Sequence, residues 1–582
     1  MRVAVIGSGL AGLTTAYLLR REGVEVWLVE KSSKVGFHAE SVVVTPSNGE
    51  TSEEVTKSAT VKSDGAKWVV DVPMRGFQGG YYPLLLSLYM HLGIPVKPTN
   101  YAYSFTSPSL STYFIHSGSS GYSIPSLPSS AYTSPFAFVR AIGTFLGTAL
   151  CYILLIALSF MAWHDFLPSP LSSPNLTLGD FTDHLTTFLS RPITIPIIGY
   201  SPWTPLGDIF RSFIDTIVLP LFSAVGTMTS SDVYSLPARV LLEYVHSTLG
   251  TDHYHFANGF SAADVARSLS APIRGQGDGH VRLNTEITGL EYAIGGGVRV
   301  TLRTGDREEE GLRVDKVVLA TQASVAKTLL RGLEASLKDW GEEKEKVRVG
   351  KIRAALEQVQ YRETIVITHR DTSILPAEPD QRPINLFLPS VPSSSTPPKS
   401  PSSITLSDSP PSEKPATPFF PPSKGIYTMA TQIMPSPKGD AESVLQTTNP
   451  VVALDPERIL GISNLERALP LKRPTDTLND LRPCSRNALV YLVGSYAYPG
   501  IPLLEGCVGS ARVAVEGLLA SLTPETDMTL HKSATGGKWP MSKIWERTKR
   551  GEGVGGIDWE AGRGSKVVRI WRWRRRKGGV WS

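Results

Sequence analysis

The clearest pattern of apolar and polar positions lies at the amino end of the chain. Residues 2–6 form a short run rich in β-branched side chains, which predicts a buried strand. Residues 13–22 carry apolar side chains at helical spacing, and residues 24–29 form a second apolar run that ends at Glu30. The order strand, helix, strand predicts parallel strands joined by a crossover helix, and hence an α/β fold.

The turn between the first strand and the helix is rich in glycine and reads Gly7-Ser8-Gly9-Leu10-Ala11-Gly12. In a dinucleotide-binding turn, the first glycine permits the tight turn and the second lets the backbone approach a pyrophosphate. The third lets the helix pack closely on the strand, and the N–H groups at the helix start hold the phosphate charge. Glu30, roughly 20 residues further on, is placed to accept the ribose hydroxyls. The sequence therefore predicts a dinucleotide site.

The segment after this acid reads Lys31-Ser-Ser-Lys-Val-Gly36-Phe37-His38-Ala39. Here the sequence resembles the flavin-containing amine oxidase superfamily. In that family the ribose-binding acid is followed by a basic residue and by a glycine turn that passes under the phosphates of the flavin cofactor. Gly36 and His38 match the branch of the family that carries histidine, and Phe37 stands in the place of a second glycine.

The resemblance returns in three later segments. Residues 69–93 resemble the segment that leads from the flavin into the substrate domain. Residues 283–321 resemble the β-meander and the return strand that complete the cofactor domain. The family places a small apolar residue that touches adenine at the position of Ile287, and the return strand ends at Thr321.

The third segment, residues 492–519, resembles the carboxyl-terminal flavin segment of the family. Its strand ends at Gly494, and Ser495 stands where family members usually have an acid. The residues Glu505, Gly506 and Cys507 then open an apolar helix whose first N–H groups would face the pyrimidine edge of the flavin. Because both chain ends return to one cofactor, the resemblance implies FAD.

The resemblance also implies the architecture. We expect an α/β protein with a Rossmann-like FAD-binding domain and a discontinuous α+β substrate domain, as in glutathione-reductase-like and amine-oxidase-like folds. The FAD-binding domain is predicted to comprise residues 1–80, 256–330 and 481–521. The substrate domain is predicted to comprise residues 81–255 and 331–480, with a disordered insert at 389–424. Residues 522–582 are predicted to form a basic, disordered tail.

A second strong pattern is an uncharged apolar segment at residues 141–163, which is long enough to span a bilayer. A single crossing would put the glycine turn and residues 494–507 on opposite sides of the membrane, although both are expected at one flavin. Three alternatives stay open: insertion into one leaflet, a re-entrant or paired span with residues 193–228, or a buried helix. We expect an intracellular, membrane-associated protein with a lipophilic small-molecule substrate.

Composition and charge narrow the function classes. The formal charge of +5 over 582 residues is mild, and the folded part lacks a basic stripe interleaved with aromatics, so nucleic acid is excluded as a partner. The three cysteines show no paired spacing, which argues against a disulfide scaffold and a metal cluster. Asp252, His253 and His255 alternate as they would in a strand, which favours a strand of the substrate region over a metal site.

The predicted function is an FAD-dependent oxidoreductase of amine-oxidase type, which transfers a hydride from a carbon of a lipophilic amine or unsaturated lipid to flavin N5. A lipid or carotenoid desaturase or isomerase is the alternative within the fold. A non-catalytic carrier of lipids or prenylated proteins is the alternative from another class. No side chain stands out as a catalytic acid or base, and we assign no metal ligand.

Overall fold

The computed structural model describes residues 1–37, 41–44, 68–72, 76–118, 125–195, 199–201, 205–305, 307–388, 426–434, 442–481, 488–521, 554–559 and 561–562. The predicted site residue His38, the cysteine Cys484 and the predicted insert 389–424 lie outside these residues.

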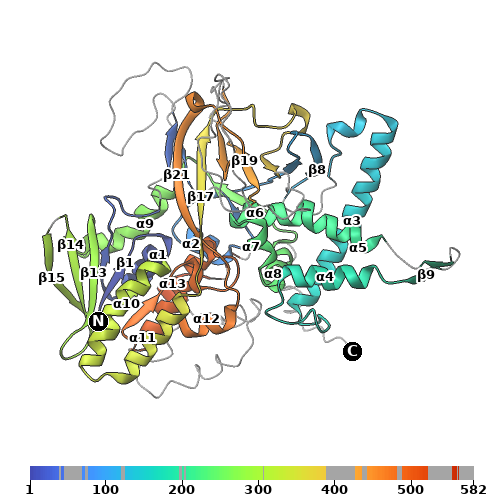
Figure 1. Cartoon of the computed structure of the whole chain (residues 1–582). Helices are drawn as coiled ribbons and strands as arrows, with labels where there is room; N and C mark the ends of the chain where they lie inside the picture. The colour runs from blue at the N-terminus through green and yellow to red at the C-terminus, as the bar shows by residue number, and fades with distance from the viewer. Residues whose placement is uncertain are drawn as a thin grey trace, which may run out of the picture.

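The cofactor domain is built on a five-stranded parallel sheet (Figure 1). Its strands, in spatial order, are β12 (Val281–Arg282), β2 (Glu25–Val29), β1 (Arg2–Ile6), β16 (Lys316–Leu319) and β22 (Val490–Leu492). Three distant parts of the chain therefore meet in one sheet. Because the carboxyl ends of parallel strands lie at the same edge, the glycine turn after β1 and the segment after β22 are neighbours.

Helices and a second sheet cover this central sheet. The packed elements are α1 (Leu10–Arg21), α2 (Pro83–His91), α9 (Ala262–Arg274) and α13 (Leu504–Ala520), with the antiparallel meander β13 (Thr285–Tyr292), β14 (Val298–Thr304) and β15 (Arg307–Val314). Helix α10 (Ala323–Asp339) packs against β13 of the meander, and helix α11 (Glu343–Leu356) packs against α10. The cofactor domain thus continues to residue 356, beyond the predicted boundary at 330, because buried leucines of α10 need the meander as their partner.

The substrate domain contains a seven-stranded mixed sheet. Its strands, in spatial order, are β21 (Ile459–Ala468), β17 (Tyr361–His369), β20 (Leu445–Thr448), β19 (Met429–Ile433), β18 (Ile384–Phe387), β7 (Tyr103–Thr106) and β8 (Thr112–His116). The helices beside it are α3 (Pro135–Trp163), α4 (Leu178–Leu189), α5 (Leu206–Phe213), α6 (Leu219–Gly226), α7 (Ser230–Tyr234) and α8 (Ala238–Thr248). A π-helical turn, Ile214–Val218, joins α5 to α6.

Smaller elements complete the described chain. They are the sheet β5 (Phe77–Gln78), β11 (His253–Phe256) and β6 (Val96–Thr99), the pairs β3 (Val42–Val44) with β4 (Trp68–Val70) and β9 (Ile193–Ile195) with β10 (Gly199–Ser201), helix α12 (Pro474–Leu481), and short 3-10 turns. Strand β11 carries His253 and His255, so the predicted strand at this position is confirmed.

Helix α3 contains the apolar segment and starts before it. Ser134 caps the helix by accepting a hydrogen bond from the N–H of Ala137 at 3.1 Å, and Pro135 occupies the first turn. Two helical stretches in the described chain are apolar and long enough to cross a membrane, Pro135–Trp163 and Leu206–Gly226. This criterion concerns length and composition, and core helices of soluble proteins meet it too.

A short part of the predicted disordered tail is packed. Residues Val554–Gly556 form a 3-10 turn beside α1 and α13, and Ile557 and Trp559 are buried. The guanidinium of Arg512 lies 5.4 Å from the centre of the Trp559 ring. For residues 554–559 the prediction of a disordered tail is therefore wrong, because these two large apolar side chains cover the outer surface of the helices.

Candidate flavin site

The three glycines of the amino-terminal turn differ in their surroundings. Gly7 has φ +100°, and an added Cβ would lie 2.7 Å from the carbonyl oxygen of Ala320. A Cβ at Gly12 would lie only 1.9 Å from the carbonyl oxygen of Gly7. A Cβ at Gly9 would meet no atom within 4 Å. The first and third glycines therefore serve close packing, whereas the second faces open space that a ligand can occupy.

The start of helix α1 faces the same space. Gly9 is its N-cap residue and provides no side-chain cap, and the first turn, with Leu10 and Ala11, contains no acid. The N–H groups and the positive end of the helix dipole are thus available to an anion. This arrangement fits the predicted pyrophosphate contact.

Glu30 is held by two serines. One carboxylate oxygen accepts hydrogen bonds from the N–H and hydroxyl of Ser8 at 2.7 and 2.8 Å, and the other accepts from the N–H and hydroxyl of Ser32 at 2.9 and 2.8 Å. The N–H of Gly36 donates to the Ser8 hydroxyl at 2.9 Å. Burial alone would raise the pKa of Glu30, but these hydrogen bonds hold it below its ordinary value. The carboxylate is therefore ionised beside the turn, while neighbouring Lys31 is exposed.

The carboxyl-terminal segment closes on this turn. The N–H of Gly494 donates to the Ser510 hydroxyl at 3.0 Å, and a Cβ at Gly506 would lie 2.8 Å from the carbonyl oxygen of Ser495. Burial raises the pKa of Cys507 to about 12, and Arg467 together with the N–H groups of Ser495 and Ala11 opposes that rise. The Cys507 thiol is therefore neutral and lies between the two chain ends.

Glu505 has a structural role in addition to its predicted position beside the flavin. Its carboxylate accepts hydrogen bonds from the N–H groups of Leu84 and Leu85 at 2.9 and 3.0 Å. These are orphan donors in the first turn of α2, so Glu505 caps that helix from a distant part of the chain. The side chain fixes α2 to α13, and the contact of its backbone with a flavin ring stays a prediction.

Two predicted residues lie at the edge of this region. Ile287 is half-buried on β13 and packs against the meander core. The carbonyl oxygen of Thr321 accepts a hydrogen bond from the Tyr496 hydroxyl at 3.1 Å, which ties the return strand to the carboxyl-terminal segment. Their contacts with adenine and flavin stay predictions.

A group of residues that sequence reasoning missed extends from this region into the substrate domain. We call it the aromatic cluster, and it comprises Tyr81, Tyr82, Tyr101, Tyr103, His116, Tyr152, Tyr244 and His253. Ring centres lie 4.7 Å apart for Tyr81 and Tyr244, 5.3 Å for Tyr101 and His253, 5.9 Å for Tyr103 and His116, and 5.8 Å for His116 and Tyr152.

The aromatic cluster is uncharged. Burial lowers the pKa of His116 and of His253 to about 4 and raises the pKa of Tyr152 and Tyr244 well above the ordinary value. Tyr152 belongs to α3, so the cluster connects the carboxyl-terminal segment with the apolar helix. The spacing of these residues along the chain does not indicate the cluster, because seven separate elements and loops contribute them.

Comparisons with known proteins identify the family. Residues 5–92 match the model of the NAD(P)-binding Rossmann-like domain, and residues 208–519 match that of the flavin containing amine oxidoreductases. The chain belongs to the flavin-containing amine oxidoreductase family. It is accordingly an FAD-dependent oxidoreductase of amine-oxidase type, and the predicted family, fold class and enzyme class are confirmed.

Two solved structures are similar to this chain. Cyclohexylamine oxidase from Brevibacterium oxydans is 14% identical with a TM-score of 0.46, and the match covers 89% of this chain and 98% of that chain. A redesigned putrescine oxidase is 13% identical with a TM-score of 0.43, and the match again covers 89% and 98%. None of the curated proteins matches this sequence.

The residues present fit FAD. The open space at Gly9, the uncapped start of α1 and the ionised Glu30 suit a pyrophosphate and a ribose. Near Cys507, Nε of Arg467 is fully enclosed and has no hydrogen-bond partner among the described residues. A buried orphan donor of this kind indicates a missing polar ligand.

Proposed function

We propose that this enzyme oxidises a lipophilic amine, or another lipophilic molecule with an oxidisable carbon, that it takes up from an intracellular membrane surface. The observation that carries the proposal is the aromatic cluster. At one end the Tyr81 hydroxyl donates to the carbonyl oxygen of Ile501 in the carboxyl-terminal flavin segment at 3.0 Å. At the other end Tyr152 belongs to the apolar helix α3, and Tyr103 lies between Tyr244 and Tyr152. When bound, FAD would supply the oxidising chemistry by accepting a hydride equivalent at N5.

The residues of the chain would bind and orient the substrate. The aromatic cluster offers apolar ring surface and neutral polar groups, and burying a charged ammonium there without a counter-ion would be costly. The cluster therefore favours the neutral form of an amine, which is also the form whose carbon is more readily oxidised. An uncharged, enclosed environment also keeps water away from the reacting carbon.

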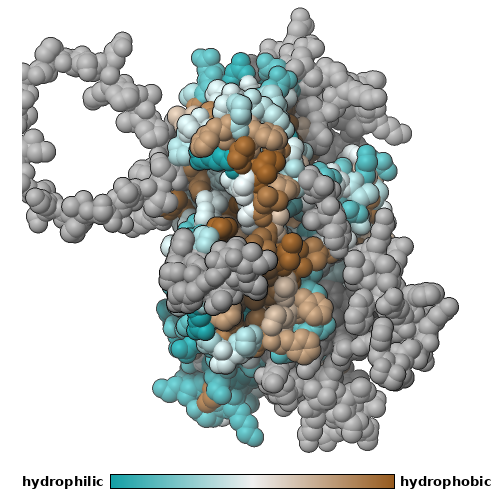
Figure 2. Space-filling view, turned by 90° about the vertical axis from the view of Figure 1, so that its right-hand side faces the viewer, coloured by the Kyte–Doolittle hydropathy of each residue, from teal (hydrophilic) through white to brown (hydrophobic). Residues whose placement is uncertain are grey.

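The proposed membrane contact rests on the outer face of α3. Exposed apolar side chains follow this helix and its flanks, namely Tyr132, Phe136, Phe138, Val139, Ile142, Leu146, Leu150, Ile153, Phe160 and Phe166. Figure 2 views the side of the molecule on which α3 lies and shows a band of apolar side chains along it. Such a continuous apolar surface, with Arg140 as its one strongly basic residue, suits the acyl region of a leaflet.

The inner face of α3 argues for one leaflet rather than a crossing. Cys151, Leu155 and Leu158 are buried where α3 packs on α8 and α5. Arg239 of α8 binds the Asp165 carboxylate at 2.7 Å and the Ala162 carbonyl oxygen at 3.3 Å at the end of the helix. A helix attached to the substrate domain along its carboxyl half fits shallow insertion of the amino half.

The substrate proposal is tested by anaerobic addition of primary amines with short, medium and long alkyl chains to the FAD-loaded protein. The proposal expects flavin bleaching, with KM falling as the chain lengthens. Tyr244→Ala should raise KM for the long-chain amine most, whereas the control variant Trp340→Ala, at a side chain that is 52% exposed at the end of α10, should leave it unchanged. Bleaching by short polar amines alone would contradict a lipophilic substrate.

The membrane proposal is tested separately by flotation with phospholipid vesicles. A variant with Phe136, Val139 and Leu146 changed to serine should lose most vesicle binding, because each large apolar side chain contributes about 1.5–3 kcal/mol when fully buried. The control changes Val325 and Val347, which are exposed on α10 and α11, to serine and should float as the wild type does. Equal flotation of all three proteins, or none, would contradict the assignment of α3.

A further inference from the structure

Arg467 lies on the inward side of β21. Along this strand Leu460, Ile462 and Glu466 are exposed, whereas Ser463 and Arg467 belong to the alternate, inward-facing set. A cation at an inward position of a sheet requires compensation, because desolvating a charge costs several kcal/mol.

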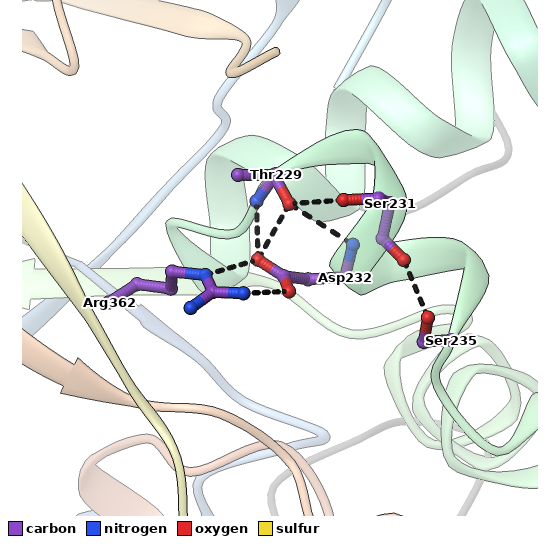
Figure 3. A network of polar contacts seen from close by, with 5 residues as sticks. All are labelled: Thr229, Ser231, Asp232, Ser235 and Arg362. Carbon is purple, nitrogen blue, oxygen red and sulfur yellow. Dashed lines mark hydrogen bonds and ion pairs between the residues drawn. The ribbon is translucent and has the colours of Figure 1, made fainter. Parts of the chain in front are cut away.

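Arg362, the neighbour of Arg467 on the adjacent strand, is compensated by an ion pair with a carboxylate. Arg362 of β17 pairs directly with Arg467 in the antiparallel register, so the two side chains leave the sheet on the same face. Figure 3 shows that Arg362 forms a two-pronged ion pair with Asp232, through Nε at 2.9 Å and Nη2 at 2.8 Å. The carboxylate of Asp232 is itself fixed by the N–H and hydroxyl of Thr229.

Arg467 has no such partner. The described residues offer its guanidinium neither a hydrogen bond nor an ion pair, and its Nε is fully enclosed. The groups that interact with it electrostatically are Tyr82 and Cys507. Both are neutral, since burial raises the pKa of Cys507 to about 12 and keeps Tyr82 protonated. Two arginines thus lie side by side across the strands, and within the described part of the chain a carboxylate neutralises Arg362 but not Arg467.

The position of Arg467 indicates which anion is missing. Cys507 lies in the first turn of α13 and near the N–H groups of Ala11 and Ser495, where the two chain ends meet. This is the segment at which the flavin ring is expected. A guanidinium there is a fixed positive charge directed toward the place where negative charge develops when flavin takes up electrons.

We propose that Arg467 is the cofactor-contacting cation that stabilises the anionic, reduced form of the flavin at its pyrimidine edge. This inference rests on the proposed function only in that FAD must bind. It concerns the redox equilibrium of the cofactor and is independent of the substrate. The partial positive charge at the start of α13 would also stabilise the reduced flavin, and Arg467 would add a full positive charge to it.

The test compares Arg467→Met, which removes the charge, with Arg467→Lys, which retains it. In the FAD-loaded proteins, the affinity for sulfite, which adds to flavin N5 and leaves negative charge on the ring, should fall at least tenfold in the Met variant. The two-electron midpoint potential should fall by about 30 mV or more, the equivalent of tenfold for a two-electron couple. The Lys variant should stay within threefold of the wild type in sulfite affinity.

A second measurement uses the apoproteins. Since Arg467 has no partner among the described residues, the apo Met variant should resist denaturant at least as well as the wild type, while the stabilisation gained on adding FAD should be smaller. Unchanged potential and sulfite affinity in a Met variant that binds FAD would overturn the inference. A destabilised apo Met variant would also overturn it, since the charge would then serve the protein alone. Failure of the wild type to bind FAD would instead refute the proposed function.

Discussion

The glycine turn permits a sharp test, because two chemically identical substitutions should have opposite effects. Gly12→Ala places a methyl group 1.9 Å from the carbonyl oxygen of Gly7, where ordinary contacts begin near 3.4 Å. The helix must therefore move by about 1.5 Å, the difference between these distances, relative to β1. The turn cannot follow freely, since the N–H of Gly7 donates to Val29 at 2.8 Å. We expect a loss of about 3 kcal/mol in unfolding free energy.

Gly9→Ala should leave the apoprotein intact. Gly9 has φ −60° and ψ 174°, which alanine adopts readily, and the new methyl group meets no protein atom within 4 Å. Removing a glycine from the unfolded chain should even stabilise the fold by about 0.5 kcal/mol. The methyl group would, however, occupy the space assigned to the pyrophosphate, so FAD affinity should fall at least tenfold.

The assay measures denaturant unfolding of each apoprotein and fluorescence titration of each with FAD. We expect Gly12→Ala to lose stability and Gly9→Ala to retain stability but lose FAD affinity. Unchanged FAD affinity in Gly9→Ala would refute the placement of the ligand. A fully stable Gly12→Ala would refute the close packing of α1 on the turn.

Three further predictions concern buried ionisable groups. The pKa of Glu30 is lower in the folded than in the unfolded chain, so the ionised carboxylate stabilises the fold above about pH 4.5, and this stabilisation is lost at lower pH. In Glu30→Gln the denaturant midpoint should therefore decline less steeply with falling pH below about 4.5. The same decline in the variant and the wild type would contradict this. His253 has a folded pKa of about 4 against 6.5 when unfolded, so this side chain alone should lower the unfolding free energy by about 2 kcal/mol between pH 7 and pH 5. His253→Phe should reduce the total loss by that amount, and equal losses measured by urea unfolding would count against a neutral His253. Glu505→Gln leaves the N–H of Leu85 without an acceptor and should cost about 1–3 kcal/mol in unfolding free energy, whereas a neutral effect would argue against the cap of α2.

The cofactor turn could be predicted because its chemistry is local. Gly7, Gly9, Gly12 and Glu30 lie within one strand-helix-strand unit, and their spacing alone fixes their relative places. The convergence of both chain ends followed from the family resemblance, and the pairing of β16 with β22 bears it out.

The other features of the site depend on packing between residues far apart in the sequence, which the spacing of residues along the chain cannot predict. In β21 apolar residues occur on both faces, with Leu460 and Ile462 exposed, so alternation could not show that Arg467 points inward. The cap of α2 by Glu505 joins residues about 420 positions apart. The packing of Trp559 on the cofactor domain likewise lies in a segment whose composition indicates only polarity and charge.

The binding of FAD between the two chain ends is tested by the visible spectrum of the purified protein after incubation with FAD and gel filtration. We expect one FAD retained per chain, with the spectrum of a protein-bound flavin, and loss of that flavin in Gly9→Ala. A wild-type protein that emerges colourless, or an equal yield of flavin in Gly9→Ala, would contradict a cofactor held between the amino-terminal turn and the carboxyl-terminal segment.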